Sequence, residues 1–366
     1  MDSFDDLLSR AAAAPLALSH EELVRILSPA DEAERAALHA AAYGVKLRVS
    51  GPRVFLRGLV EIGNVCAKNC FYCGLRRDNA AVHRYVIPEA DVVRMARWAF
   101  ERRYGSVVLQ SGEIEGAAHA ESIARIVRAI RAFGGEDFAI VLSLGEQTEE
   151  VYRLWREAGA VRYLLRIETS SPSLYATLHP ADHSWTRRRD CLRALGRLGY
   201  QVGSGVMIGL PGQTADDLAA DIEFFRDENI HMIGMGPFLP HSQTPLGVVC
   251  VDPARQLALG LDMVAATRLF LHDRNLAATT VLQSLAPDGR ERALKAGANV
   301  VMPNVTDTAY RRDYRLYENK PCLEETSDQC RGCLERRIAS IGEKIAWGEP
   351  GTSPHYLAKR AAAQRP

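Results

Sequence analysis

The sequence predicts an α/β protein built as a parallel (β/α)8 barrel of the TIM type, with an N-terminal helical extension and a C-terminal cysteine-containing segment. From residue 55 onward, short apolar runs alternate with longer amphipathic stretches. Eight such repeats over about 250 residues suit a closed barrel. The apolar runs are rich in Val, Leu and Ile, as strands buried on both faces are. A doubly wound sheet would give a similar alternation and is the alternative.

The elements follow from local patterns. Residues 1–50 are Ala-rich, and Ser19 is a candidate N-cap before Leu23, Ile26 and Leu27 at helical spacing, which predicts a helical extension. The barrel is assigned to residues 51–320 and the cysteine-containing segment to 321–366. The basic tail, 348–366, is expected to be loosely attached. The predicted strands are 55–63, 106–111, 138–144, 161–168, 201–208, 232–236, 277–282 and 299–302, and the clearest helices are 89–103, 120–133, 149–158 and 215–228.

Composition excludes several classes of protein. The 366 residues carry 45 Lys and Arg against 45 Asp and Glu, a balance that argues against a general nucleic-acid or acidic-membrane binder. Charged residues at 25% and hydrophobic residues at 47% are typical of a globular chain. No apolar run reaches the roughly 18 residues of a membrane span, and residues 1–10 carry acids where a signal peptide is basic. We therefore expect a cytoplasmic protein without nucleic-acid or membrane partners.

Six of the eight cysteines form two tight triplets, a pattern typical of metal ligands rather than of a disulfide framework. Cys66, Cys70 and Cys73 follow the first predicted strand. Three thiolates can bind three irons of a cubane cluster and leave the fourth iron open. A structural zinc site would want a fourth protein ligand, and the nearest histidine, His83, lies ten residues beyond Cys73. The triplet therefore favours a 4Fe–4S cluster over zinc.

The spacing Cys66-x3-Cys70-x2-Cys73, with Tyr72 before the last cysteine, resembles the radical S-adenosylmethionine (SAM) superfamily. In that superfamily the open iron binds the amino and carboxylate groups of SAM, and the reduced cluster cleaves SAM to a 5′-deoxyadenosyl radical. The resemblance implies binding roles for further residues at predicted strand ends. Glu113 would accept from the methionine ammonium, Glu168 from the ribose hydroxyls, and Arg188 or its neighbour Arg187 would pair with the methionine carboxylate. Glu113 is the last residue of the element Ser111-Gly112-Glu113, and the resemblance implies that Ser111 and Gly112 also belong to the SAM-binding site. The arginine run 187–189 would equally suit a solvated helix face.

A longer set of segments resembles the HydE family of FeFe-hydrogenase maturases, in the same order and over about residues 50–350. They are 70–79, 209–214, 234–241, 278–280, 297–304 and the tyrosines of 310–317. This resemblance implies assembly of the diiron subcluster of the hydrogenase from a cysteine-bound organometallic iron substrate. Other hydrogenase maturases and a low-potential electron donor would be its partners. Arg166 would bind a substrate carboxylate, with hydroxyl donors from Thr279, Thr280, Tyr314 and Tyr317.

Strand alternation would place Arg166 and Glu168 on the same inward face. The same rule allows only one of Thr279 and Thr280 to face the lumen, and β propensity alone would also explain a Thr-Thr pair. Polar residues at strand ends are, in general, ordinary turn positions. It is their number here that favours a shared pocket.

The second triplet, Cys322-x7-Cys330-x2-Cys333, resembles an accessory-cluster site found in many members of that family. Ligand softness favours a second iron–sulfur cluster. A zinc knot and free thiols are the alternatives. We expect this site to be dispensable for SAM cleavage.

The sequence departs from the family at two positions beside the predicted pocket. Ile167 stands where a histidine is expected and Ile114 where an acid is expected, so a different substrate is an open alternative. Methylornithine synthase, which has a similar barrel, is the first rival. A non-catalytic iron–sulfur carrier is a rival of another class, although a carrier has no use for Glu113, Glu168 and an arginine around one cluster. A zinc-binding structural protein is the last alternative.

Overall fold

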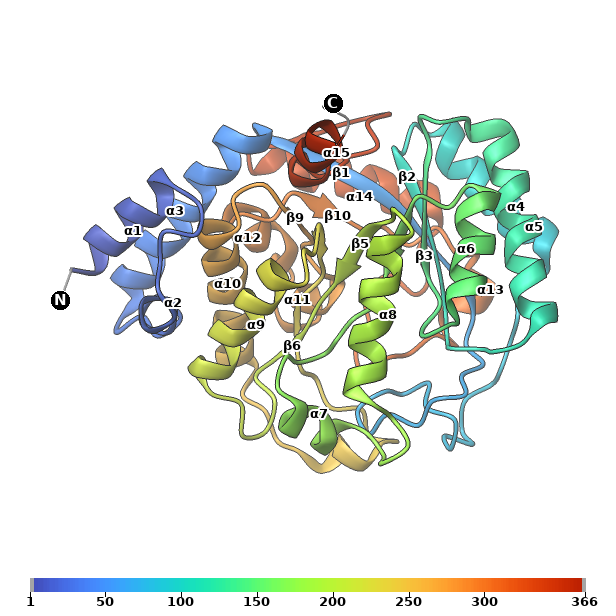
Figure 1. Ribbon diagram of the computed structural model, residues 1–366, viewed down its shortest axis with the longest axis horizontal. Coiled ribbons are helices and arrows are strands. Elements are labelled where there is room, and N and C mark those ends of the chain that lie inside the picture. The colour runs from blue at the N-terminus through green and yellow to red at the C-terminus, as the bar shows by residue number, and fades with distance from the viewer. Residues whose placement is uncertain (1–2, 364–366) are drawn as a thin grey trace.

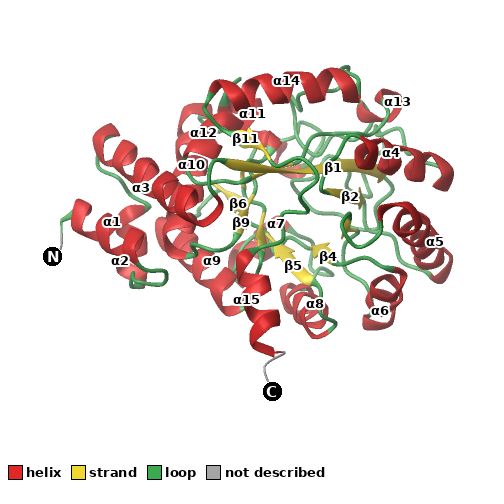
Figure 2. Ribbon diagram, turned by 90° about the horizontal axis from the view of Figure 1, so that it is seen from above, coloured by secondary structure: helices red, strands yellow, loops and turns green. Residues whose placement is uncertain are grey.

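The computed structural model describes residues 3–363. Its centre is a parallel sheet of nine strands, eight of which follow the order β10-β1-β2-β3-β4-β5-β7-β9, with β11 pairing with β1 outside this path. Backbone hydrogen bonds join the two ends of the order, because Asn299 N donates to Leu276 O (2.9 Å) and Ala278 N donates to Val300 O (2.8 Å). The sheet therefore curls until its ends meet, and helices surround it (Figure 2). The predicted barrel is confirmed.

The strands are short except for the first. They are β1 (Arg53–Gly63), β2 (Ser106–Ser111), β3 (Ala139–Ser143), β4 (Arg162–Leu164), β5 (Gln201–Ser204), β6 (Met207–Ile208), β7 (Met232–Ile233), β8 (Gly236–Pro237), β9 (Asn275–Leu276), β10 (Val300–Val301) and β11 (Lys344–Ile345). The predicted strand 201–208 is divided into β5 and β6, which belong to different sheets. A Cβ on Gly205, between them, would lie 1.9 Å from Gly234 O, so close backbone approach requires glycine there.

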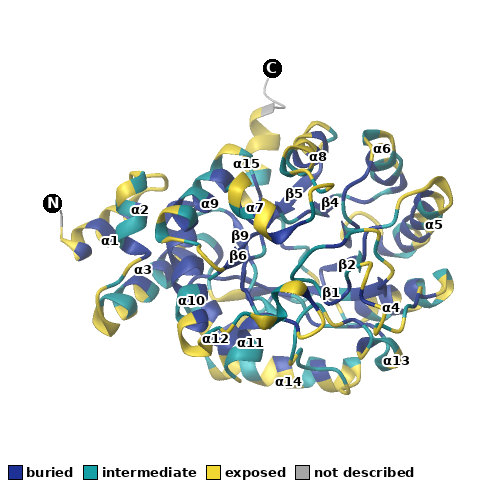
Figure 3. Ribbon diagram, turned by 90° about the horizontal axis from the view of Figure 1, so that it is seen from below, coloured by how far each residue is buried: buried dark blue, intermediate teal, exposed yellow. Residues whose placement is uncertain are grey.

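Most helices lie on the outer surface and bury one face (Figure 3). Those of the extension and the first half are α1 (Phe4–Ala13), α2 (His20–Ile26), α3 (Glu32–Ser50), α4 (Glu89–Glu101), α5 (Ala117–Gly134), α6 (Glu149–Ala158), α7 (Pro172–Leu178) and α8 (Trp185–Arg197). The second half holds α9 (Ala215–Asp227), the 3-10 helix η1 (Pro245–Val248), α10 (Pro253–Phe270), α11 (Thr280–Leu285), α12 (Gly289–Lys295), α13 (Thr308–Arg311), α14 (Ser327–Ser340) and α15 (Pro354–Ala363).

The N-terminal helices pack on one side of the barrel, next to α9 and α10 (Figure 1). The predicted N-cap at Ser19 is confirmed, since its side chain accepts from Glu22 N and Glu22 reaches back to the cap backbone. On α3, the apolar residues Leu38, Ala42 and Val45 are buried at intervals of three and four, and α3 packs against α10.

The predicted strand 277–282 is wrong, although Ala277 forms an isolated bridge with Val300. β9 ends at Leu276, Thr279 caps a helix, and α11 begins at Thr280. Val281 and Leu282 are buried from this helix, and a short apolar run cannot distinguish a strand from a buried helix by periodicity. The expectation of strand alternation at Thr279 and Thr280 fails with the strand.

The tail is also different from the prediction. Residues 348–356 contact the barrel, where Arg162 Nη1 donates to Pro350 O (2.7 Å) and Asn275 Nδ2 donates to Gly351 O (2.7 Å). Ser353 is fully buried and α15 follows it. The tail is therefore attached because it supplies acceptors to buried polar groups of β4 and β9. Residues 364–366 lie outside the described part.

Candidate active site

The first cysteine triplet lies on the segment that leaves the carboxyl end of β1, which is where barrel enzymes place their chemistry. Cys66, Cys70 and Cys73 are free thiols and are partly buried. Glu113 N donates to Cys66 Sγ (3.3 Å), a contact that favours a thiolate. Burial raises the pKa of all three thiols, that of Cys70 to about 12. Such thiols become thiolates when a soft metal supplies the positive charge, so the donor set fits an iron–sulfur cluster.

Neighbouring elements fix this segment from several sides. Phe71 N donates to Leu178 O (2.9 Å), and Leu246 N donates to Phe71 O (3.0 Å). Asn69 N donates to His183 Nε2 (3.0 Å). Tyr72 contacts the edge of the His179 ring, with 5.5 Å between ring centres. The cysteine segment is thus held by the loops around α7 and η1.

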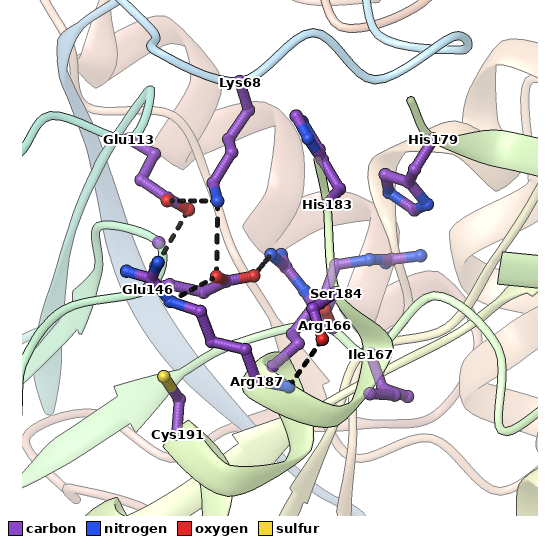
Figure 4. A network of polar contacts seen from close by, with 12 residues as sticks. Lys68, Glu113, Glu146, Arg166, Ile167, His179, His183, Ser184, Arg187 and Cys191 are labelled. Carbon is purple, nitrogen blue, oxygen red and sulfur yellow. Dashed lines mark hydrogen bonds and ion pairs between the residues drawn. The ribbon is translucent and has the colours of Figure 1, made fainter. Parts of the chain in front are cut away.

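Glu146, at the carboxyl end of β3, is the centre of a buried charged network (Figure 4). Its carboxylate pairs with Arg188 Nη1 (2.8 Å), Lys68 Nζ (3.3 Å) and Arg187 Nε (3.4 Å). Burial alone would raise the pKa of Glu146, but Arg188 and Lys68 outweigh it and hold the pKa below its ordinary value. Glu146 is therefore ionised and fixes three cations from two segments, Lys68 of the cysteine segment and Arg187 and Arg188 of α8.

Glu113 lies next to this network. Its Oε2 accepts from Glu146 N (2.8 Å), and Lys68 Nζ lies 3.1 Å from its Oε1. A Cβ on Gly145 would come within 2.2 Å of Oε2, and Gly145 has a φ of +78°, so glycine is required for this approach. Burial raises the pKa of Glu113. Its carboxylate is a rigid acceptor close to Cys66, which is what an ammonium group would need.

Glu168 lies beyond the end of β4 with a φ of +70°, a left-handed backbone that is strained for a residue with a side chain. Its carboxylate pairs with Arg166, whose Nη2 lies 3.0 Å from Glu168 Oε2. Arg166 also donates from Nη1 to Gly234 O (2.7 Å) and from Nη2 to Val206 O (2.8 Å). Both side chains therefore meet, although neither residue belongs to β4, and Arg166 is held by carbonyls of the links from β5 to β6 and from β7 to β8.

Arg188, on α8, is largely buried, with 14% of its side chain exposed, and belongs to the Glu146 network. Besides Glu146 it donates from Nε to Arg166 O (2.5 Å). The solvated helix face is therefore excluded for Arg188, whereas Arg187 is half exposed. A methionine carboxylate bound by Arg188 would share the Arg188 guanidinium with the carboxylate of Glu146.

The predicted substrate residues are divided between two places. Tyr314 is buried and its hydroxyl accepts from Gln110 Nε2 (3.1 Å), at the end of β2. Burial raises the pKa of Tyr317, and Glu61 and Arg166 are among its charged neighbours. Thr279 Oγ1 donates to Met235 O (2.8 Å), in the link after β7, so its hydroxyl proton is already used within the chain. The structure brings the tyrosines to the barrel interior and gives Thr279 a partner within the chain.

The two departures from the family lie in different surroundings. Ile167 is fully buried in the hydrophobic core, its N donates to Ser204 Oγ (3.1 Å), and Figure 4 shows it apart from the charged network. Ile114 is partly exposed, and its carbonyl accepts from Gln147 Nε2 (3.0 Å). An isoleucine at 167 therefore fits the packing at this position.

The second triplet gathers at the start of α14. Cys330 and Cys333 are three apart on this helix and share a face, and Cys322 precedes it with a φ of +62°. Buried Arg311 donates to Cys322 O (3.2 Å) and to Ser327 Oγ (3.1 Å). A hydrogen bond from Cys330 lowers the pKa of Cys322 to about 6 and raises that of Cys330. Within residues 3–363, no three His, Cys, Asp or Glu side chains are arranged as ligands of one metal ion.

Lys68 and Glu146 were missed by the sequence reading. Lys68 lies between Cys66 and Cys70, and Glu146 follows the third predicted strand by two residues. The position of Glu146 at the carboxyl end of a barrel strand is a signal that the sequence does contain. Nothing in the sequence distinguishes Lys68 from a solvent-exposed lysine.

No helix of residues 3–363 combines the length and apolar character that crossing a membrane requires.

Comparisons with known proteins agree with this geometry. Residues 60–225 match the model of the Radical SAM superfamily. The chain is 42% identical over 332 residues to the FeFe hydrogenase maturase subunit HydE of Thermotoga maritima, covering 90% of this chain and 93% of that one. The crystal structure of methylornithine synthase, PylB, superposes with a TM-score of 0.79 at 23% identity over 94% of this chain and 98% of that one. The X-ray structure of the FeFe-hydrogenase maturase HydG from Carboxydothermus hydrogenoformans superposes with a TM-score of 0.77 at 18% identity, over 94% of this chain and 79% of that one. The chain is a radical SAM enzyme, and within that superfamily it belongs to the family of the FeFe-hydrogenase maturase HydE.

Proposed function

We propose that this enzyme reductively cleaves SAM and acts in the assembly of the FeFe-hydrogenase active site, on a small organometallic iron substrate. The observation that carries the proposal is the identity to HydE over nine-tenths of the chain, combined with the cysteine triplet beside Glu113. A 4Fe–4S cluster, when bound and reduced, supplies the electron that breaks a carbon–sulfur bond of SAM. The radical so formed would react with the substrate in the barrel.

The residues of this chain have distinct parts in the proposal. Cys66, Cys70 and Cys73 would each hold one iron of the cluster, and Tyr72, beside Cys73, would line the cofactor site. Glu113 accepts a hydrogen bond from the methionine ammonium, with Ser111 and Gly112 forming the turn. Arg188 binds the methionine carboxylate. Glu168 accepts from the ribose hydroxyls, and Arg166, which pairs with Glu168, binds a substrate carboxylate.

The buried charges explain how such a site can be ready before SAM arrives. Glu146 and Glu113 are matched by Lys68 and Arg188 inside the protein, so the acceptor and the cation needed by methionine are both fixed in place. Fixed charges need no reorganisation when the ligand binds. A dry barrel interior protects a radical from water.

For the second triplet we propose an iron–sulfur cluster that is not required for SAM cleavage, a proposal that rests on its cysteine spacing and on the contact between Cys322 and Cys330. Its place at the start of α14, which lies across the barrel from α8 in Figure 2, supports this separation. The partners that follow from the proposal are a low-potential electron donor and other hydrogenase maturases.

Complementation tests the biological part of the proposal. In a host that makes the unassembled FeFe-hydrogenase and the other maturases but has no HydE, expression of this chain should restore hydrogen evolution. The Cys66→Ala variant, made to the same level, is the matched control and should restore none. Full SAM cleavage in vitro without complementation would contradict the maturase role. Formation of methylornithine by the same preparation would then favour the rival enzyme.

A further inference from the structure

The turn that carries Glu168 depends on neighbouring elements for its shape. A left-handed backbone at a residue with a side chain persists only where the surroundings hold it. On one side Glu168 N donates to Gly205 O (3.0 Å) and Met207 N donates to Glu168 O (2.9 Å), which tie it to β5 and β6. On the other side Trp185 Nε1, at the start of α8, donates to Thr169 O (3.0 Å).

A third tie comes from α9. Ser170 N donates to Asp221 Oδ1 (2.6 Å), a carboxylate from a helix 51 positions further along the chain. Asp221 is fully buried, and its Oδ2 has no hydrogen-bond partner in the described chain. Its charged neighbour on α9 is Asp217, another acid, which offers no compensation. Burying such a carboxyl costs stability, and an apolar residue at this place on α9 would not.

We propose that Asp221 is a positioning residue for Glu168: its carboxylate holds the Ser170 amide and thereby fixes the strained turn that presents the Glu168 carboxylate to the ribose of SAM. This inference rests on the proposed function, because the ribose contact of Glu168 is part of it. It adds a residue outside the cysteine segment and outside the Glu146 network. The buried acid is explained by the turn that it holds rather than by the packing of α9.

If Asp221 positions Glu168, removal of its carboxylate should weaken the binding of SAM and leave the cluster intact. Loss of the acceptor lets the turn relax and moves the Glu168 carboxylate, while the cysteines and Glu113 stay in place. The affinity for SAM should therefore fall by roughly tenfold, the order expected for one charge-assisted hydrogen bond. The turnover of bound SAM and the iron content should change little.

The test compares Asp221→Leu, which removes the acceptor at similar size, with Asp221→Asn, which keeps an acceptor for Ser170 N. Asp217→Ala is the matched control on α9, since it removes the capping box with Thr214 without touching the turn. Each is loaded with iron and sulfide anaerobically, and its dissociation constant for SAM is measured by equilibrium dialysis. KM and kcat for 5′-deoxyadenosine formation are measured in parallel. Should the Leu variant not fold, Asp221→Ala carries the same prediction.

We expect a roughly tenfold higher dissociation constant for Asp221→Leu at unchanged iron content, with Asp221→Asn and Asp217→Ala near the wild type. Combined with Glu168→Gln, the Leu substitution should weaken SAM binding no further, because both act through one contact. A wild-type dissociation constant in Asp221→Leu, or full additivity with Glu168→Gln, would overturn the inference. A wild-type protein that holds its cluster and binds no SAM would instead overturn the proposed function.

Discussion

Gly112 leaves no room for a side chain beside the first cysteine. A Cβ at this position would lie 2.2 Å from Val65 O and 2.7 Å from Cys66 Cβ. Neither atom is the end of a flexible side chain, so the backbone before Cys66 would have to move. The position of Cys66 therefore requires that residue 112 be a glycine, which has no side chain.

Gly112→Ala should therefore lower the amount of cluster that the protein holds. We expect less than half of the wild-type iron and sulfide after reconstitution, because the displaced Cys66 no longer points with its two partners. Iron and sulfide analysis of the purified protein measures this. Gly44→Ala, on α3, is the control: its Cβ would meet only the end of Arg48 at 3.8 Å, and the iron content should not change. Equal iron in both variants would show that the approach of Gly112 is not needed.

The two cysteine triplets should separate in function. Cys66→Ala should abolish formation of 5′-deoxyadenosine, since one iron loses its ligand, whereas Cys330→Ala should leave it largely intact. Both variants are assayed after anaerobic reconstitution, with circular dichroism to verify folding. Similar losses in the two would contradict the division into catalytic and accessory sites.

A fully buried ion pair connects α3, in the N-terminal extension, with the residue that precedes β11 near the C-terminus. Lys46, on α3, pairs with Glu343, next to β11, and both side chains are inaccessible to solvent. Tyr43 donates to the same carboxylate (2.7 Å), and Lys295 of α12 donates to Tyr43 (2.9 Å). The extension, the last strand and α12 therefore share one polar cluster.

Breaking this pair from one side should be costly. Glu343→Leu leaves the Lys46 ammonium buried without a partner, and we expect a loss of about 3–5 kcal/mol in the free energy of unfolding. Urea denaturation followed by circular dichroism measures it. The double variant Lys46→Met/Glu343→Leu should regain most of the loss, because no charge is then left unpaired. A double variant as unstable as the single one would show that packing, not charge, is at stake.

The sequence predicts the helices better than the strands, and the reason is physical. Helix 149–158 is bounded by a Thr cap and a glycine and was predicted to the residue. The runs 201–208 and 277–282 contain glycine or threonine positions at which a barrel strand ends and a turn begins, and an apolar run of this length does not reveal the break. The cysteines, Glu113 and Glu168 are predictable because spacing and strand ends place them. Glu146 has the same signal, a position just after a strand, whereas Lys68 and Asp221 are not predictable, because their roles come from contacts between segments distant in the sequence.

For the molecule as a whole, Asp221 makes stability depend on pH. Burial raises its pKa to about 7, from an ordinary value of 3.8. The folded state then holds a proton that the unfolded state has lost, so this group lowers stability progressively as pH rises from about 4 to 7 and by a constant amount above. Asp221→Asn removes the titration. Its melting temperature relative to the wild type should therefore increase between pH 5 and pH 8, and an unchanged difference would show that Asp221 is ionised throughout.

The barrel brings these scales together, because parallel strands place the cysteine segment, Glu113, Glu146 and Glu168 at one end of the sheet. We propose that SAM is cleaved at this carboxyl end of the strands. The direct measurement is anaerobic reconstitution with iron and sulfide, reduction with dithionite in the presence of SAM, and quantification of 5′-deoxyadenosine. We expect the wild-type protein to form the nucleoside and Cys66→Ala to form none. A protein that holds a complete 4Fe–4S cluster and forms no 5′-deoxyadenosine would not be a SAM-cleaving enzyme, and an iron–sulfur carrier would then be favoured.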